Sequence, residues 1–159
     1  MDVKSIEKFK VWQIENEIIV GKFWGEQDEK DAKNFIIEMY KLTMPSGIKE
    51  KADAIFDKFL KSEGQEITKE FIGEVNKLIG ETDKKIKILI DASEGGKSTS
   101  SARNIYVEFA RSFETGKVAI FGSTTLIRVV ASFIVRAAGR GNVKFFATEK
   151  ESLEWLKEE

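Results

Sequence analysis

The sequence contains no histidine and no cysteine, and only one proline among its 159 residues. Without cysteine the chain has no disulfide framework, no thiolate metal site and no cysteine nucleophile. Without histidine it lacks the side chain that titrates near neutral pH unperturbed, which is also the usual triad base and the commonest metal ligand. These absences exclude most routes to ordinary hydrolytic catalysis, and the sequence points to no metal and no cofactor.

An excess of charge of one sign is also missing. The 26 basic and 27 acidic side chains leave a net charge of −1, so no global field attracts nucleic acid. No apolar segment follows the N-terminal Met1, and no run approaches the roughly 18 apolar residues of a membrane span. We therefore expect a soluble, cytoplasmic protein that has no integral membrane segment and does not bind nucleic acid.

What the chain does contain is enough apolar material for a core. It is 42% hydrophobic and carries 12 phenylalanines, which argues against disorder. A chain of about 150 residues buries roughly 68–70% of its unfolded surface. We expect a single domain over residues 1–159.

The first half of the chain alternates and then becomes helical. The apolar runs at 8–14 and 17–24 flank a short polar break, which predicts a β-hairpin. Three amphipathic helices are predicted next, because apolar residues recur at three- and four-residue spacing; their apolar faces run from Ala32 to Tyr40, from Ile48 to Leu60 and from Ile67 to Ile79. Residues 45–64 are interpreted as a helical elaboration of the domain.

The second half alternates short apolar strands with helices. Strands are predicted at 85–91, 117–122 and 142–147, and helices at 101–113 and 124–138. A capping box of Thr148 and Glu151 predicts a last helix. Strand–helix–strand units with short turns form right-handed crossovers. The fold class is therefore α/β, with a largely parallel sheet.

Residues 91–99, DASEGGKST, nearly match a phosphate-binding loop. Gly96, Lys97 and Ser98 fit the pattern, but Asp91 stands where the first glycine belongs. A carboxylate at that place repels phosphate, which disfavours nucleotide hydrolysis. A glycine-containing turn that leads into a helix is the preferred interpretation, in which Asp91 organises the turn.

Hydroxyl groups gather after the predicted strands, where ligands bind in open α/β sheets. Ser123, Thr124 and Thr148 are suited to helix capping. The run 98–101 is longer than one cap requires, which favours a further role. The candidate residues for binding or for a switch are Asp91, Ser98, Ser100, Ser101, Ser123 and Thr124.

The predicted helix 124–138 has almost no polar face apart from a narrow stripe that includes Arg128 and Arg136. Either it is buried on several sides, or part of it forms a dimer or ligand surface. The arginines form a solvated edge or contact an anionic ligand such as phosphate or a lipid headgroup. The ligand-contact candidates are Arg128, Arg136, Phe133 and Ile134. Separately, the three tryptophans at 12, 24 and 155 are predicted to lie in the core.

Three segments carry a family resemblance: KILIDASEGGKSTSSARNIYVEF, KVAIFGSTTLIRVVASFIVRAAG and NVKFFATEKESLEWLKE. Together with the hairpin, they resemble the SpoIIAA-like (STAS-like) family, which is related to STAS and CRAL-TRIO proteins. The resemblance implies a mixed, mostly parallel sheet of four or five strands with helices around it.

The resemblance also implies two styles of function. STAS domains bind protein partners, and in anti-sigma antagonists a serine at the start of the helix after this strand is phosphorylated; by position, Ser100 or Ser101 would carry it. The sequence departs from the family's Asp-Ser-Ser/Thr-Gly pattern, with Ser98 near the Asp position and Ala102 or Arg103 near the Gly. Lipid-exchange relatives instead hold an apolar ligand between helices and sheet.

Our first hypothesis is a non-enzymatic regulatory or interaction module that binds a protein partner through the 98–101 and 122–125 segments. The alternative is a carrier of a small apolar or amphipathic ligand, with Phe133 and Ile134 in contact with it and Arg128 or Arg136 on a headgroup. A nucleotide-binding enzyme is the third and least favoured hypothesis. A homodimer is an open expectation in each case.

Overall fold

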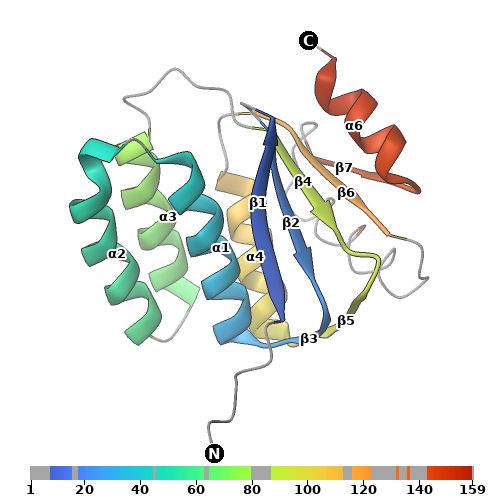
Figure 1. Ribbon diagram of the computed structural model, residues 1–159. Helices are drawn as coiled ribbons and strands as arrows, with labels where there is room; N and C mark the ends of the chain where they lie inside the picture. Colours follow the sequence, from blue (N-terminus) through green and yellow to red (C-terminus); the bar gives the residue numbers. More distant parts are fainter. Residues whose placement is uncertain are drawn as a thin grey trace, which may run out of the picture.

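A five-stranded sheet forms the centre of the computed structural model, which describes residues 8–15, 18–44, 46–62, 65–79, 87–112, 116–122, 132, 136 and 143–158 (Figure 1). Its strands, in spatial order, are β1 (Phe9–Glu15), β2 (Ile18–Phe23), β4 (Lys87–Asp91), β6 (Val118–Phe121) and β7 (Val143–Phe146). β1 is antiparallel to β2, and every other neighbouring pair is parallel. The predicted α/β class, hairpin and mostly parallel sheet are confirmed.

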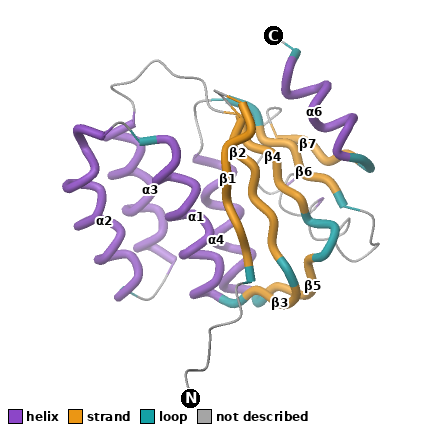
Figure 2. The backbone as a smooth tube through the Cα atoms, in the orientation of Figure 1, coloured by secondary structure: helices purple, strands orange, loops and turns teal. Residues whose placement is uncertain are grey.

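Helices cover both faces of this sheet (Figures 1 and 2). On one face lie α1 (Glu29–Thr43), α3 (Gln65–Ile79) and α4 (Ser100–Ser112), and α2 (Lys49–Lys61) stands farthest from the sheet. A short 3₁₀ turn, η1 (Ser46–Ile48), precedes α2. The last helix, α6 (Glu149–Lys157), lies on the opposite face.

Strand alternation divides the core into two clusters, because successive side chains of a strand point to opposite faces. Ile88 and Ile90 of β4 join the helices α1 to α4 in the helical-face cluster, whereas Leu89 points to α6. Among the described residues, the α6-face cluster is much smaller and contains Ile18, Val20, Leu89, Ala119, Phe121 and Leu156. Most of the apolar packing in the described part of the chain therefore lies on one side of the sheet.

Helix α1 packs closely on β2. A Cβ atom added to Gly21 would lie 2.5 Å from Cζ of Phe35 and 2.7 Å from Cε of Met39, which is inside van der Waals contact. Asp28 caps the start of α1: its side chain accepts from the Asp31 amide, while the Asp31 side chain accepts from the Asp28 amide. This reciprocal pair satisfies two of the amides that a helix start leaves open.

The structure corrects one expectation about residues 91–99. The predicted turn into a helix contains a short strand, β5 (Gly95–Ser98), which pairs in parallel with β3 (Gly25–Gln27) as a separate two-stranded sheet. A Cβ atom on Gly96 would lie 3.0 Å from the backbone carbon of Gly25. Glycine at position 96 therefore allows two strands to approach closely. This close approach, and not phosphate binding, explains the glycine that resembles one of a phosphate loop.

The prediction that all three tryptophans lie in the core was wrong. Trp12, Trp24 and Trp155 are half-buried, and a lysine ammonium lies within 6 Å of the centroid of each indole ring. Trp12 and Trp155 pack at the border of the α6-face cluster. An indole offers both apolar area and a face that attracts cations, so the alternation of the sequence alone does not settle its burial.

The predicted helix 124–138 falls outside the described residues, except that Ser132 and Arg136 are helical and exposed. Within the ranges given above, no helix is long and apolar enough to cross a membrane.

Candidate interaction surface

The candidate site begins where the parallel strands β2 and β4 end side by side. Lys22 of β2 and Asp91 of β4 are register partners. The Nζ atom of Lys22 lies 3.6 Å from Oδ2 of Asp91 and 2.8 Å from Oε2 of Glu94. One ammonium thus joins two carboxylates beyond the carboxyl ends of the strands, the edge at which α/β sheets bind ligands.

An indole completes this group. Nε1 of Trp24 donates a hydrogen bond to Oε2 of Glu94 at 2.8 Å, and Nζ of Lys22 lies 5.6 Å from the Trp24 ring centroid. Trp24 is half-buried and Glu94 is exposed. A partly exposed tryptophan that is fixed by a hydrogen bond resembles the rigid aromatic anchors found at protein interfaces.

The charges of this group shape its ionisation. The hydrogen bond from Lys22 and the positive charge of that ammonium lower the pKa of Glu94, and the Trp24 indole N–H lowers it further. The hydrogen bond with Glu94 raises the pKa of Lys22, with desolvation acting against it. Both side chains therefore keep their charges near neutral pH, so the surface presents a fixed ion pair.

Asp91 organises the turn that follows its strand. Its Oδ1 accepts from the backbone N–H of Ser93 at 3.0 Å and also from the Ser93 hydroxyl. This is an Asx-type turn, in which a side chain replaces a backbone acceptor. The geometry matches the turn-organising interpretation of Asp91, and Asp91 also contributes a carboxylate to Lys22.

The two-stranded sheet joins this group to the start of α4. The Gly25 N–H donates to the Glu94 carbonyl at 3.1 Å, and the Thr99 N–H donates to the Gln27 carbonyl at 3.0 Å. Gln27 is fully buried, and its Nε2 donates to the carbonyls of Lys8 and Trp24. Because a strand rises about 3.3 Å per residue, the ends of the three-residue strand β3 are about 7 Å apart.

The start of α4 carries the predicted serines. Thr99 is the residue that caps the helix, since its Oγ1 accepts from the Ala102 amide at 3.1 Å. Ser100 and Ser101 are the first two residues of α4, and both are exposed. Ser98 ends β5 and is half-buried. The hydroxyl run thus divides into a strand end, a cap and two exposed side chains.

Arg103 holds this helix start. Its guanidinium donates to the Ser98 carbonyl through Nη1 and to Oγ of Ser100 through Nη2, the latter at 3.2 Å. The Arg103 amide also closes the first turn on the Thr99 carbonyl at 3.0 Å. A planar guanidinium with several donors suits a phosphate or a carboxylate, and here it already touches one of the two exposed serines.

We call the whole set the carboxyl-end surface; it comprises Lys22, Trp24, Asp91, Glu94, Ser98, Thr99, Ser100, Ser101 and Arg103. The structure brings four of the predicted site residues together here: Asp91, Ser98, Ser100 and Ser101. The contributions of Lys22, Trp24 and Glu94 were not foreseen. A signal existed in the pairing of a lysine at the end of one strand with acids at the end of its parallel neighbour, but it requires knowing that β2 and β4 are adjacent.

The remaining candidates cannot be assigned to this surface from the described residues. Arg136 is exposed and helical, whereas Ser123, Thr124, Arg128, Phe133 and Ile134 lie outside the described residues. The carrier hypothesis, which depends on Phe133, Ile134 and either Arg128 or Arg136, stays a prediction. Across the described ranges, no group of three or more acidic, histidine or cysteine side chains could hold a metal ion.

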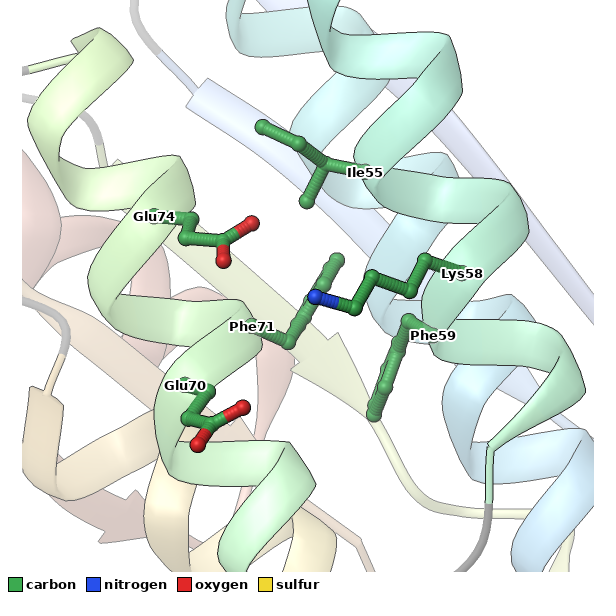
Figure 3. Close-up of a pocket in the computed structure, with 6 residues that line it drawn as sticks. All are labelled: Ile55, Lys58, Phe59, Glu70, Phe71 and Glu74. Carbon is green, nitrogen blue, oxygen red and sulfur yellow. The ribbon is translucent and has the colours of Figure 1, made fainter.

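A small depression lies between α2 and α3 (Figure 3). The stacked rings of Phe59 and Phe71, with centroids 3.9 Å apart, form its floor beside Ile55, and Lys58 extends between Glu70 and Glu74 at its rim. Its cavity volume is about 10 Å³, about the space of one water molecule. Ligand pockets are typically about 300–1,000 Å³, so this depression is a seam between helices.

Comparisons with known proteins agree with this architecture. The family model described as SpoIIAA-like matches residues 18–157. No curated protein matches the chain. Among solved structures, an uncharacterized Shewanella loihica PV-4 protein with a SpoIIAA-like fold is similar, with a TM-score of 0.51, 16% identity and coverage of 98% of this chain and 99% of that one.

A second similar structure is the anti-sigma factor antagonist SpoIIAA in its unphosphorylated form, with a TM-score of 0.47, 14% identity, and coverage of 94% of this chain and 97% of that chain. At such identities a structural likeness concerns the fold alone. The family assignment rests instead on the family model, which spans all strands and helices from β2 to α6. The chain belongs to the SpoIIAA-like family.

Proposed function

We propose that the chain is a non-enzymatic regulatory module that binds a protein partner through the carboxyl-end surface. The observation that carries this proposal is the placement of Ser100 and Ser101, which are exposed on the first turn of α4 beside Arg103. The paired strands β3 and β5 join this turn to Trp24 and its hydrogen-bond partner Glu94. The surface combines a half-buried tryptophan and an arginine, residue types that are enriched at protein interfaces, with an ion pair and exposed hydroxyl groups beside them.

The same placement supports a phosphorylation switch at Ser100 or Ser101. A phosphate adds nearly two negative charges near neutral pH. The positive end of the α4 dipole stabilises such a charge in the first turn, and the Arg103 guanidinium provides donors for its oxygens. Phosphorylation would therefore leave the fold intact while it makes the surface presented to a partner negatively charged.

The test is affinity capture, in which the purified chain is immobilised and the proteins that it retains from a cell lysate are measured by quantitative mass spectrometry. The wild type is compared with Ser100→Asp, Ser101→Asp and the two alanine variants. Ala54→Asp places the same charge on an exposed residue of α2 and is the matched control. We expect at least one protein to be retained by the wild type, the alanine variants and the control, and reduced about tenfold by one of the aspartate variants.

A second variant separates recognition from the switch. Trp24→Ala removes the aromatic anchor without changing the charge, and it should reduce capture of the same protein. Identical capture by all variants would contradict the proposed surface. Loss with Trp24→Ala but not with either aspartate variant would retain the surface and reject the switch.

A further inference from the structure

One lysine beside the sheet hydrogen-bonds to the end of helix α6. Lys117 precedes β6, and its backbone carbonyl accepts from the Ile88 amide at 2.9 Å, so its main chain is part of the sheet. Its Nζ donates to the carbonyl oxygens of Trp155 at 2.9 Å and Glu158 at 2.7 Å. Carbonyls in the last turn of a helix lack the amides that serve those of the helix interior, and a cation there also interacts favourably with the helix dipole.

The same ammonium contacts an aromatic ring of that helix. It lies 4.9 Å from the centroid of Trp155, which is three residues before the capping residue Glu158. The Glu158 amide donates to the Trp155 carbonyl at 3.2 Å and closes the last turn. We call this arrangement of a lysine, a capping carbonyl and a ring three residues earlier a lysine–aromatic clasp.

A second clasp fastens α2. Lys33 of α1 donates to the carbonyl of Ser62, the residue that caps α2, and its Nζ lies 5.1 Å from the centroid of Phe59, three residues before Ser62. The Ser62 amide donates to the Phe59 carbonyl at 3.3 Å. The C-termini of two helices at opposite sides of the molecule therefore make the same set of contacts with a lysine (Figure 1).

The surroundings of the two clasps differ. Lys33 is only 4% exposed, and Phe59 stacks on Phe71 within the helical-face cluster. Lys117 and Trp155 are both half-buried. Among residues of α6 itself, the buried side chains are Ser152 and Leu156. The first clasp adds to a helix that buries Ala52, Phe56 and Phe59, whereas the second fastens a helix whose one fully buried apolar side chain is Leu156, with Leu153 and Trp155 partly buried.

We propose that α6 is a strap that detaches from the sheet as a unit while the rest of the chain stays folded, and that the Lys117 clasp sets how often it opens. A nine-residue helix is too short to persist alone in water, so its order depends on docking. Local openings occur where few apolar contacts hold an element. The Lys117 hydrogen bonds therefore contribute a large share of what holds α6.

Native-state hydrogen exchange measured by mass spectrometry tests the proposal on the full chain. In the wild type, amides of 149–158 should exchange faster than those of α2 and β4, with little dependence on low urea concentrations. Lys117→Met should accelerate exchange in 149–158 by about 10- to 100-fold, because two charge-assisted hydrogen bonds are lost. Exchange in 49–61 and 87–91 should stay unchanged.

Lys144→Met is the matched control, since Lys144 is exposed and its Nζ also lies over the Trp155 ring, 5.3 Å from the centroid. It should accelerate α6 exchange by less than about threefold, and Lys117→Arg should keep α6 close to the wild-type rate. The proposal is overturned if wild-type α6 exchanges only together with β4, or if Lys117→Met leaves 149–158 unchanged. It is also overturned if Lys117→Met unfolds the whole chain.

Discussion

The two faces of the sheet differ in how much apolar packing covers them, although the same strands supply side chains to both. On the helical face, four helices enclose a continuous cluster in which aromatic rings contact one another, among them Phe35 with Phe9, Phe23 and Tyr106. On the other face, Leu156 of α6 belongs to the small α6-face cluster. The ammonium groups of Lys117 and Lys144 lie over the Trp155 ring. Among the described residues, the first face buries the larger apolar cluster, and we therefore expect it to contribute more of the free energy of unfolding than the second.

The largest loss of stability is expected from a substitution of Phe35 on the helical face. Phe35→Ala removes a ring that is 3% exposed and touches three other rings. We expect the free energy of unfolding to fall by about 3–5 kcal/mol, measured by urea denaturation, with a single cooperative transition. A loss below about 1 kcal/mol would show that the helical face does not carry the stability assigned to it.

The matching change on the other face is Leu156→Ala, at a residue with no exposed surface. We expect the free energy of unfolding to fall by about 2 kcal/mol, the lower end of what such truncations cost. The cost is low because detachment of α6 removes the cavity that the truncation would leave. Circular dichroism should show a small loss of helix before the main transition. A loss as large as that of Phe35→Ala, in one transition, would make the two faces equivalent.

The smallest effect concerns a buried hydroxyl on the helical face. The Tyr106 hydroxyl has no hydrogen-bond partner among the described residues, and burial raises the pKa of Tyr106, with Asp31 and Asp28 adding to the rise. An unsatisfied buried hydroxyl is destabilising. Tyr106→Phe should therefore raise the free energy of unfolding by up to about 1 kcal/mol. A decrease of that size in urea denaturation would show that this hydroxyl is hydrogen-bonded in solution.

The sequence predicted much of the fold because its signals are local. Hydrophobic spacing indicated the hairpin, the helices α1 to α4 and the strands β4, β6 and β7, and Thr148 does cap α6 by accepting from the Glu151 amide at 3.2 Å. The pairing of β3 with β5 was not predictable from such spacing. These strands are short, rich in glycine and polar, and their pairing joins segments 70 residues apart.

The candidate site was only partly predictable for the same reason. The serines of α4 follow a recognisable strand, so their place at the carboxyl end could be expected. Lys22, Trp24 and Glu94 belong to different segments and acquire meaning only when β2 and β4 lie side by side. The role of Gly96 was hidden by its likeness to a phosphate-loop glycine, although a close strand approach explains it.

The recognition site is tested by hydrogen exchange of the chain with and without the partner recovered by affinity capture. A saturating partner should slow exchange in 22–28 and 93–103, which contain Trp24, Glu94 and the start of α4. Exchange in α2 should not change. Protection confined to α2 or α6, with 22–28 and 93–103 unchanged, would contradict the assignment of the carboxyl-end surface as the recognition site.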